Sequence, residues 1–156
     1  MIAAFAEAGF APPRMVFTVQ RELSARLAAT PGGKNYSSFS VLCQHVYQVR
    51  ERFTLRPGAF YPAPEVMSAV IELAPRGAAD PPALRALFNE LVRALFLSRR
   101  KTLWNNLQAW PGARRFGPDR LRAALAAEGI HAGQRSEELR PEAVAGLARR
   151  LLSEDL

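Results

Sequence analysis

Residues 66–73, VMSAVIEL, alternate between two sets of side chains, and this period of two restricts the fold more than any other pattern in the chain. Residues 46–55, VYQVRERFTL, form a second β-rich run. The segment between them reads FYPAP at residues 60–64, and proline fixes φ and lacks a backbone donor. We therefore expect an antiparallel hairpin joined by a stiff, exposed arm that presents Phe60 and Tyr61 in one orientation.

The residues before the hairpin combine helical and strand patterns. Residues 1–9 are apolar and predict a buried helix that ends at Gly9. RMVFTV, residues 14–19, is a continuous apolar run of the kind that is buried on both faces of a parallel sheet. Helices are expected over residues 20–29 and 38–45. Together with the hairpin, these elements make half of an α/β sheet domain, so the other half is expected to precede the chain.

A turn-rich linker at residues 74–82 separates this pattern from a wholly helical one. Asp80 is expected to cap a helix whose first residue is Pro81. That helix carries an apolar stripe at helical spacing, formed by Leu84, Leu87, Phe88, Leu91 and Leu95. The sequence thus predicts two domains, an α/β part over residues 1–76 and a small all-α domain over residues 80–156.

Positive charge is concentrated in the second of these parts. The net charge of the chain is +7, and residues 93–122 alone hold eight basic residues and one acidic residue. Nearly all of the basic residues are arginines, whose planar fork suits phosphate, and this favours a nucleic-acid partner. A solvated basic surface is the alternative. We expect SRRKTLWNNLQAW, residues 98–110, to be a helix whose polar face carries Lys101, Asn105 and Gln108.

Other kinds of site find little support in the sequence. Cys43 is the only cysteine, which excludes an internal disulfide and a cysteine-based zinc site and is compatible with a reducing cytosol. His45 and His131 match no metal-ligand spacing, so no metal site is expected and both are interpreted as structural. No stretch approaches the roughly 20 apolar residues needed to cross a bilayer, and a cytoplasmic protein is expected.

Four stretches of the chain together resemble one family, the S-adenosylmethionine-dependent ribosomal RNA adenine N6,N6-dimethyltransferases of the KsgA/RsmA type. They are RMVFTVQREL, KNYSSFSVLCQ, FTLRPGAFYPAPEVMSAVIEL and SRRKTLWNNL, and the resemblance extends over nearly the whole chain. It implies that residues 1–76 are the C-terminal half of a Rossmann-like methyltransferase sheet and that residues 80–156 bind RNA. It also implies methylation of adenines in 16S rRNA during biogenesis of the small ribosomal subunit.

The resemblance implies roles for individual residues as well. Phe60 corresponds to the aromatic residue that stacks on the flipped target adenine, with a core aromatic at the end of a hairpin as the alternative. Glu65 and Trp104 depart from the family, which commonly has basic residues at these positions. The candidate RNA-binding residues are Arg99, Arg100, Lys101, Asn105, Arg114 and Arg115.

Parts of the family's site are missing from this chain. It has no glycine-rich loop for the methyl donor, no acidic partner for the donor's ribose and no Asn-Leu-Pro-Tyr-like segment. We therefore expect a truncated chain that keeps RNA recognition and base stacking but has no cofactor-binding residues. Such a chain would neither bind nor use S-adenosylmethionine by itself. An uncovered strand at residues 14–19 would also favour self-association.

Two functions of other classes remain open from the sequence. A non-catalytic module that binds RNA or the ribosome is the main alternative. A helical DNA-binding regulator is the weaker one, because it leaves the proline arm and the hairpin unexplained.

Overall fold

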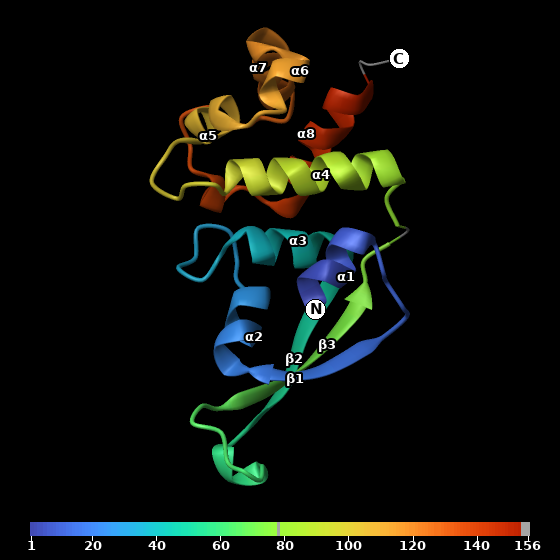
Figure 1. The fold of residues 1–156 in the computed structure, drawn as a ribbon, viewed down its shortest axis with the longest axis vertical. Coiled ribbons are helices and arrows are strands. Elements are labelled where there is room, and N and C mark those ends of the chain that lie inside the picture. Colours follow the sequence, from blue (N-terminus) through green and yellow to red (C-terminus); the bar gives the residue numbers. More distant parts are fainter. Residues whose placement is uncertain (78, 154–156) are drawn as a thin grey trace. The chain divides into compact units, whose positions relative to one another are not determined.

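A computed structural model describes residues 1–77 and 79–153. The chain forms two compact units, Met1–Ala79 and a second that begins at Asp80 (Figure 1). The first unit combines strands with helices and the second is helical, which confirms the predicted fold class. The elements of the first unit are α1 (Ile2–Ala8), β1 (Met15–Gln20), α2 (Arg21–Leu27), α3 (Ser38–Val46), β2 (Tyr47–Leu55), the 3-10 turn η1 (Pro57–Ala59) and β3 (Ser68–Pro75).

Strand β3 lies between β1 and β2 and pairs with both in antiparallel orientation. In this register Ile71 stands opposite Phe17 of β1, and Leu73 stands opposite Val49 of β2. The β2–β3 pairing confirms the predicted hairpin. It contains an irregularity at Glu51–Phe53, where the register shifts before the strand reaches the arm.

Strand β1 differs from the expectation for residues 14–19. It is antiparallel to its one neighbour in the described sheet, and its burial alternates, with Met15 buried and Val16 58% exposed. The prediction of a strand buried on both faces of a parallel sheet is therefore wrong for this structure. The physical reason is that helices cover a single face of the sheet, so only every second residue of β1 points toward the core.

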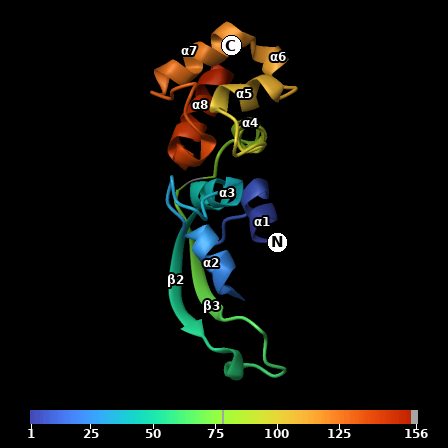
Figure 2. The same ribbon diagram turned by 90° about the vertical axis from the view of Figure 1, so that its left-hand side faces the viewer.

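The core of the first unit lies between the sheet and helices α1, α2 and α3, which cover one of its faces (Figure 2). Helix α1 ends at Gly9, as predicted, and the φ of 71° at that glycine belongs to the left-handed region. Burial in this core raises the pKa of Cys43 to about 12 and that of Tyr47 to about 12. The buried cluster consists of Ile2, Ala6, Met15, Leu27, Cys43, Tyr47, Ile71 and Leu73.

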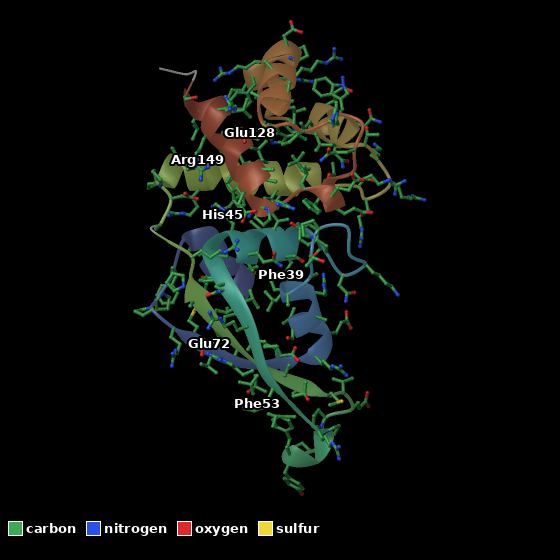
Figure 3. All side chains as sticks on the ribbon, turned by 180° about the vertical axis from the view of Figure 1, so that it is seen from behind. Phe39, His45, Phe53, Glu72, Glu128 and Arg149 are labelled. Carbon is green, nitrogen blue, oxygen red and sulfur yellow. The ribbon has the colours of Figure 1, made fainter. Side chains whose placement is uncertain are left out.

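The other face of the sheet carries charged and aromatic side chains, among them Glu72 on β3 and Phe53 on β2 (Figure 3). Arg52 donates hydrogen bonds to the Glu72 carboxylate from Nε at 3.2 Å and from Nη2 at 2.8 Å. Arg14 Nε lies 3.7 Å from the same carboxylate. The hydrogen bonds from Arg52 are the main reason why the pKa of Glu72 lies below its ordinary value.

The second unit is built around the long helix α4, which packs against α5 and α8. All five residues of the predicted apolar stripe of α4 are buried, which confirms the helical periodicity of this segment. Helix α7 contacts α8 and α6. The elements are α4 (Pro82–Leu95), α5 (Leu103–Ala109), α6 (Ala113–Phe116), α7 (Pro118–Ala127), the 3-10 turn η2 (Ser136–Glu138) and α8 (Pro141–Ser153).

Helix α4 begins one residue later than expected. Pro81 is its N-cap and Pro82 its first residue, so the prediction of Asp80 as cap and Pro81 as first residue is wrong. Pro81 has φ −52° and ψ 146°, an extended conformation. The ring of a following proline disfavours helical geometry in the preceding residue, which moves the start of the helix to Pro82.

Two kinds of feature are absent from residues 1–77 and 79–153. No helix in this part of the chain has the length and the apolar character needed to cross a membrane. The same residues include no group of three or more His, Cys, Asp and Glu side chains able to hold a metal ion.

Candidate nucleic-acid interface

The connection between β2 and β3 projects beyond the strands as an arm (Figure 1). Its first turn is closed by two backbone hydrogen bonds, from Ala59 N to Arg56 O at 3.0 Å and from Phe60 N to Pro57 O at 3.1 Å. Tyr61 follows with a relative exposure of 102%, whereas Phe60 is only partly exposed. The arm therefore displays an aromatic pair, and Phe60 is not a fully buried core residue.

Apolar surface continues from the arm onto the neighbouring strand ends. Phe53 of β2 is 56% exposed and Val66, just before β3, is 47% exposed. Glu65 and Arg56 are exposed beside them, so the departure at Glu65 places an acidic side chain on the arm itself. Exposed aromatic rings of this kind can stack on nucleobases, whose faces all offer a π-surface. The stacking role of Phe60 stays a prediction.

In the second unit, the basic residues Arg99, Arg100 and Lys101 lie on a turn between α4 and α5. The prediction that they belong to one helix with Asn105 and Gln108 is wrong, because α5 begins only at Leu103. Thr102 caps α5, and its side chain accepts a hydrogen bond from Asn105 N at 3.3 Å. A threonine before the apolar residue Leu103 is a typical helix start, so the helix begins after the basic residues.

We call residues 99–101 the basic turn, and buried polar side chains hold it in place. Asn106 is fully buried on α5 and donates from Nδ2 to Leu95 O at 2.7 Å and to Ser98 O at 3.0 Å. Ser136 Oγ of η2 donates to the same Leu95 carbonyl. The end of α4 is thus tied to α5 and to η2, and these ties fix the point from which the basic turn starts.

Further contacts close the basic turn from its other side. Arg99 Nε donates to Glu137 Oε2 at 3.1 Å, and Lys101 N donates to Ser98 O at 3.2 Å. The backbone of α5 is also joined to the segment before η2, since Leu103 N donates to Gln134 O at 2.8 Å. Sequence reasoning missed these partners. The available signal was Asn106, an amide that shares the apolar face of its helix with Leu103.

Removing the Thr102 cap gives a direct test of this local structure. Thr102→Ala should lower the free energy of unfolding by about 1 kcal/mol, because one amide of the first turn of α5 loses its partner. Thr102→Ser keeps the hydroxyl and should cost much less. Urea unfolding of the two variants measures the difference. Equal midpoints for them would show that the cap does not stabilise α5.

A second group of candidate residues, Arg114 and Arg115, lies exposed on the short helix α6. Arg115 places its guanidinium carbon 4.9 Å from the centre of the Phe116 ring. Phe116 is buried and stacks with Trp110 at a centroid distance of 5.9 Å. Aromatic packing therefore anchors α6, and one of its two arginines, Arg115, lies over the Phe116 ring. The helical unit carries two basic groups, the basic turn and α6.

Two solved structures share the fold of this chain. A dimethyladenosine transferase from Plasmodium falciparum has a TM-score of 0.74 at 18% identity, over 92% of this chain and 59% of that chain. The 23S rRNA methyltransferase ErmE has a TM-score of 0.62 at 21% identity, over 89% and 55%. The fold is one that rRNA methyltransferases use.

The chain belongs to the ribosomal RNA adenine dimethylase family, whose sequence profile matches residues 2–151. Among its curated relatives is the Ribosomal RNA small subunit methyltransferase A of Treponema denticola, 38% identical over 139 residues, with 89% of this chain and 47% of the relative covered. The enzyme of the same name from Anaeromyxobacter sp. (strain K) is 44% identical over 138 residues, with 88% and 48% covered. The chain spans about half the length of the curated relatives it matches.

Proposed function

We propose that this chain is the substrate-recognising part of an enzyme that dimethylates adenines of 16S rRNA on N6 during assembly of the small ribosomal subunit in the cytoplasm. Family membership supports the reaction class. The observation that carries the proposal for this chain is the basic turn, which three arginine and lysine side chains occupy and which Asn106 and Ser136 hold from buried positions. A rigid cluster of cations suits the RNA backbone.

The division of labour follows from the chemistry of base methylation. An enzyme that modifies a paired or stacked base must take it out of its stack, and the extruded base is held by aromatic surfaces. Phe60 on the projecting arm would supply one such surface. Phosphate contacts from the basic turn and from Arg114 and Arg115 would fix the position of the RNA on the protein. Such contacts do not distinguish one base sequence from another.

S-adenosylmethionine supplies the methyl group in this family, and one hollow of the first unit does not suit it. A hollow of about 220 Å³ in this unit is lined by residues of α2, α3 and β2 together with Thr30, Pro31 and Arg76. Its lining includes no carboxylate that could hold a ribose, and its volume lies below the roughly 300 Å³ at which small-molecule sites begin. This misfit favours, for the chain by itself, a non-catalytic RNA-binding module.

The salt dependence of RNA binding tests the proposal. In the chain with Arg99, Arg100 and Lys101 all replaced by Ala, the slope of log affinity against log salt should flatten by about two. This figure takes roughly 0.7 per neutralised phosphate on single-stranded RNA. Fluorescence anisotropy with a labelled rRNA hairpin at several salt concentrations measures the slope.

A matched control removes the same charge elsewhere on the helical unit. Arg135, Arg140 and Arg149 are exposed, and their triple Ala variant also loses three positive charges. It should change the slope by much less than the variant of the basic turn. Equal slopes for the two triple variants would mean that only net charge matters, and the basic turn would then be ordinary solvated surface.

A further inference from the structure

Trp104, one of the two departures from the family, is part of an ordered aromatic site in the helical unit. It is the second residue of α5, two residues after the cap Thr102 that follows the basic turn. The guanidinium carbon of Arg122, on α7, lies 4.7 Å from the centre of the Trp104 ring. A cation at this distance from an indole face is attracted to it, so the two side chains form a positively charged cation–π pair.

A hollow opens beside this pair. Its volume is about 500 Å³, within the range of small-molecule sites, and Trp104, Arg122, Leu125, Ala126 and residues 129–132 line it. A second hollow of about 390 Å³ also has Trp104 in its wall, together with Arg114 and Gln108. None of the described residues lining the two hollows is acidic. The ring is therefore bordered by two cavities whose described walls carry arginine side chains and no carboxylate.

The backbone around the larger hollow offers few N–H donors that could form hydrogen bonds with a ligand. Ile130 N donates to Leu125 O at 2.9 Å, and His131 N donates to Gln134 Oε1 at 3.2 Å. Gly129 N donates to Ala126 O at 3.0 Å. These three amides are therefore engaged. Apart from the His131 side chain, the wall offers apolar surface from Leu125, Ala126 and Ile130 next to the Trp104–Arg122 pair. Such an environment suits a flat, uncharged ring attached to an anion.

We propose that this hollow receives an unpaired nucleobase of the RNA, stacked against Trp104 and Arg122, at a site separate from the target adenine. Single-stranded bases in RNA are commonly held on aromatic rings and on arginine planes, with the attached phosphates on neighbouring cations. Arg122 and Arg114 border the hollows, and the basic turn ends three residues before Trp104 in the chain. The inference rests on the proposed RNA-binding function and adds a base-holding site to its phosphate contacts.

The engaged amides also determine what the site can distinguish. With stacking as the main contact, the site should accept all four bases, because every base has a π-face and stacking does not depend on the pattern of donors and acceptors. An abasic residue at the same position should lose the contact. The site would thus recognise that a nucleotide is unpaired, and not which nucleotide it is.

Tryptophan fluorescence of the full 156-residue chain provides the test. The chain has two tryptophans, and Trp110→Phe leaves Trp104 as the reporter while keeping an aromatic ring against Phe116. Three RNA hairpins of equal length are compared, one with a single bulged base, one with an abasic bulge and one fully paired. We expect quenching of Trp104 by the first hairpin alone. Equal quenching by all three would overturn the proposal, as would quenching by adenosine monophosphate with none by the bulged RNA.

Affinities of variants complete the experiment. Trp104→Leu should weaken binding of the bulged hairpin about 5- to 100-fold and leave the paired hairpin unchanged, whereas Trp104→Tyr should keep most of the affinity. Trp110→Leu is the matched control and should affect both hairpins equally, if at all. Thermal melting of each variant separates lost stacking from lost folding.

The outcomes separate this inference from the proposed function. If Trp104→Leu binds the bulged hairpin as tightly as the unchanged chain does, the base site is wrong, even where the variant of the basic turn loses affinity for every hairpin. If no hairpin binds in a salt-dependent way, the proposed RNA-binding function fails, and the base site fails with it.

Discussion

Phe60→Leu is expected to lower methyl transfer to the target adenine about ten- to a hundredfold, while Phe60→Tyr and Phe60→Trp keep most of the activity. A base stacked on an aromatic ring gains roughly 1 to 3 kcal/mol from the π-face, which leucine lacks. A badly placed base also reacts more slowly. The assay uses a chimera in which the unmatched half of a curated relative supplies the donor site, with radiolabelled methyl transfer to rRNA as the readout.

The neighbouring residue supplies the control for this prediction. Tyr61 is the more exposed ring of the arm, and Tyr61→Leu removes an aromatic side chain of similar size one position away. If the two leucine variants lose the same activity, the arm needs aromatic surface in general and Phe60 has no particular role. Melting temperatures must be measured alongside. If activity falls only in proportion to melting temperature in all variants, Phe60 is a structural residue. A core position would also rank the variants differently, because it tolerates leucine better than tryptophan.

Cys43 should react with a thiol reagent about a thousandfold more slowly in the folded chain than in the unfolded chain at pH 8. The thiolate is the reactive species, and burial, followed by the nearby charge of Glu7, raises the pKa of Cys43 from 9.0 to about 12. The same shift has a consequence for stability. The folded chain holds this proton more tightly than the unfolded chain, so between pH 9 and 12 stability should fall as the pH rises.

Absorbance with an aromatic disulfide reagent measures both rates, with the urea-unfolded chain as reference. A labelling rate of the folded chain within tenfold of the rate of the unfolded chain would contradict the prediction. It would show that the core of the first unit opens readily or that Cys43 is not buried. A Cys43→Ser variant gives the background rate and shows how much of the decline above pH 9 belongs to this thiol, since Tyr47 also has a raised pKa.

Local periodicity explains which parts of the fold could be predicted from the sequence. The hairpin strands and the stripe of α4 follow from residue spacing alone, and both are present in the structure. The sequence predicts strand β1 at the right residues, but its expected burial on both faces of a parallel sheet is wrong. An apolar run such as RMVFTV suits either a doubly covered strand or one with a single covered face, and the choice depends on which distant segments pack against it.

The site was less predictable because it depends on contacts between distant residues. The basic residues 99–101 could be picked out by composition, but their turn is defined by hydrogen bonds that reach Leu95 from Asn106 and Ser136. No spacing rule links residues 41 positions apart. The contact between Trp104 and Arg122 likewise cannot be predicted from the sequence, because it joins two different helices. The sequence marks Trp104 only as a departure from the family pattern.

The shared carbonyl of Leu95 limits how far the proposed RNA-binding surface could be reduced in size. A peptide of residues 93–122 would carry the whole net charge of +7, yet it would lack Ser136 and Glu137, which hold the end of α4 and the Arg99 side chain. Such a peptide keeps the electrostatic attraction to RNA but has no fixed shape at the basic turn. If the basic turn binds RNA as proposed, the smallest segment that keeps its shape extends through η2, and a graft into another scaffold has to carry both α4 and η2.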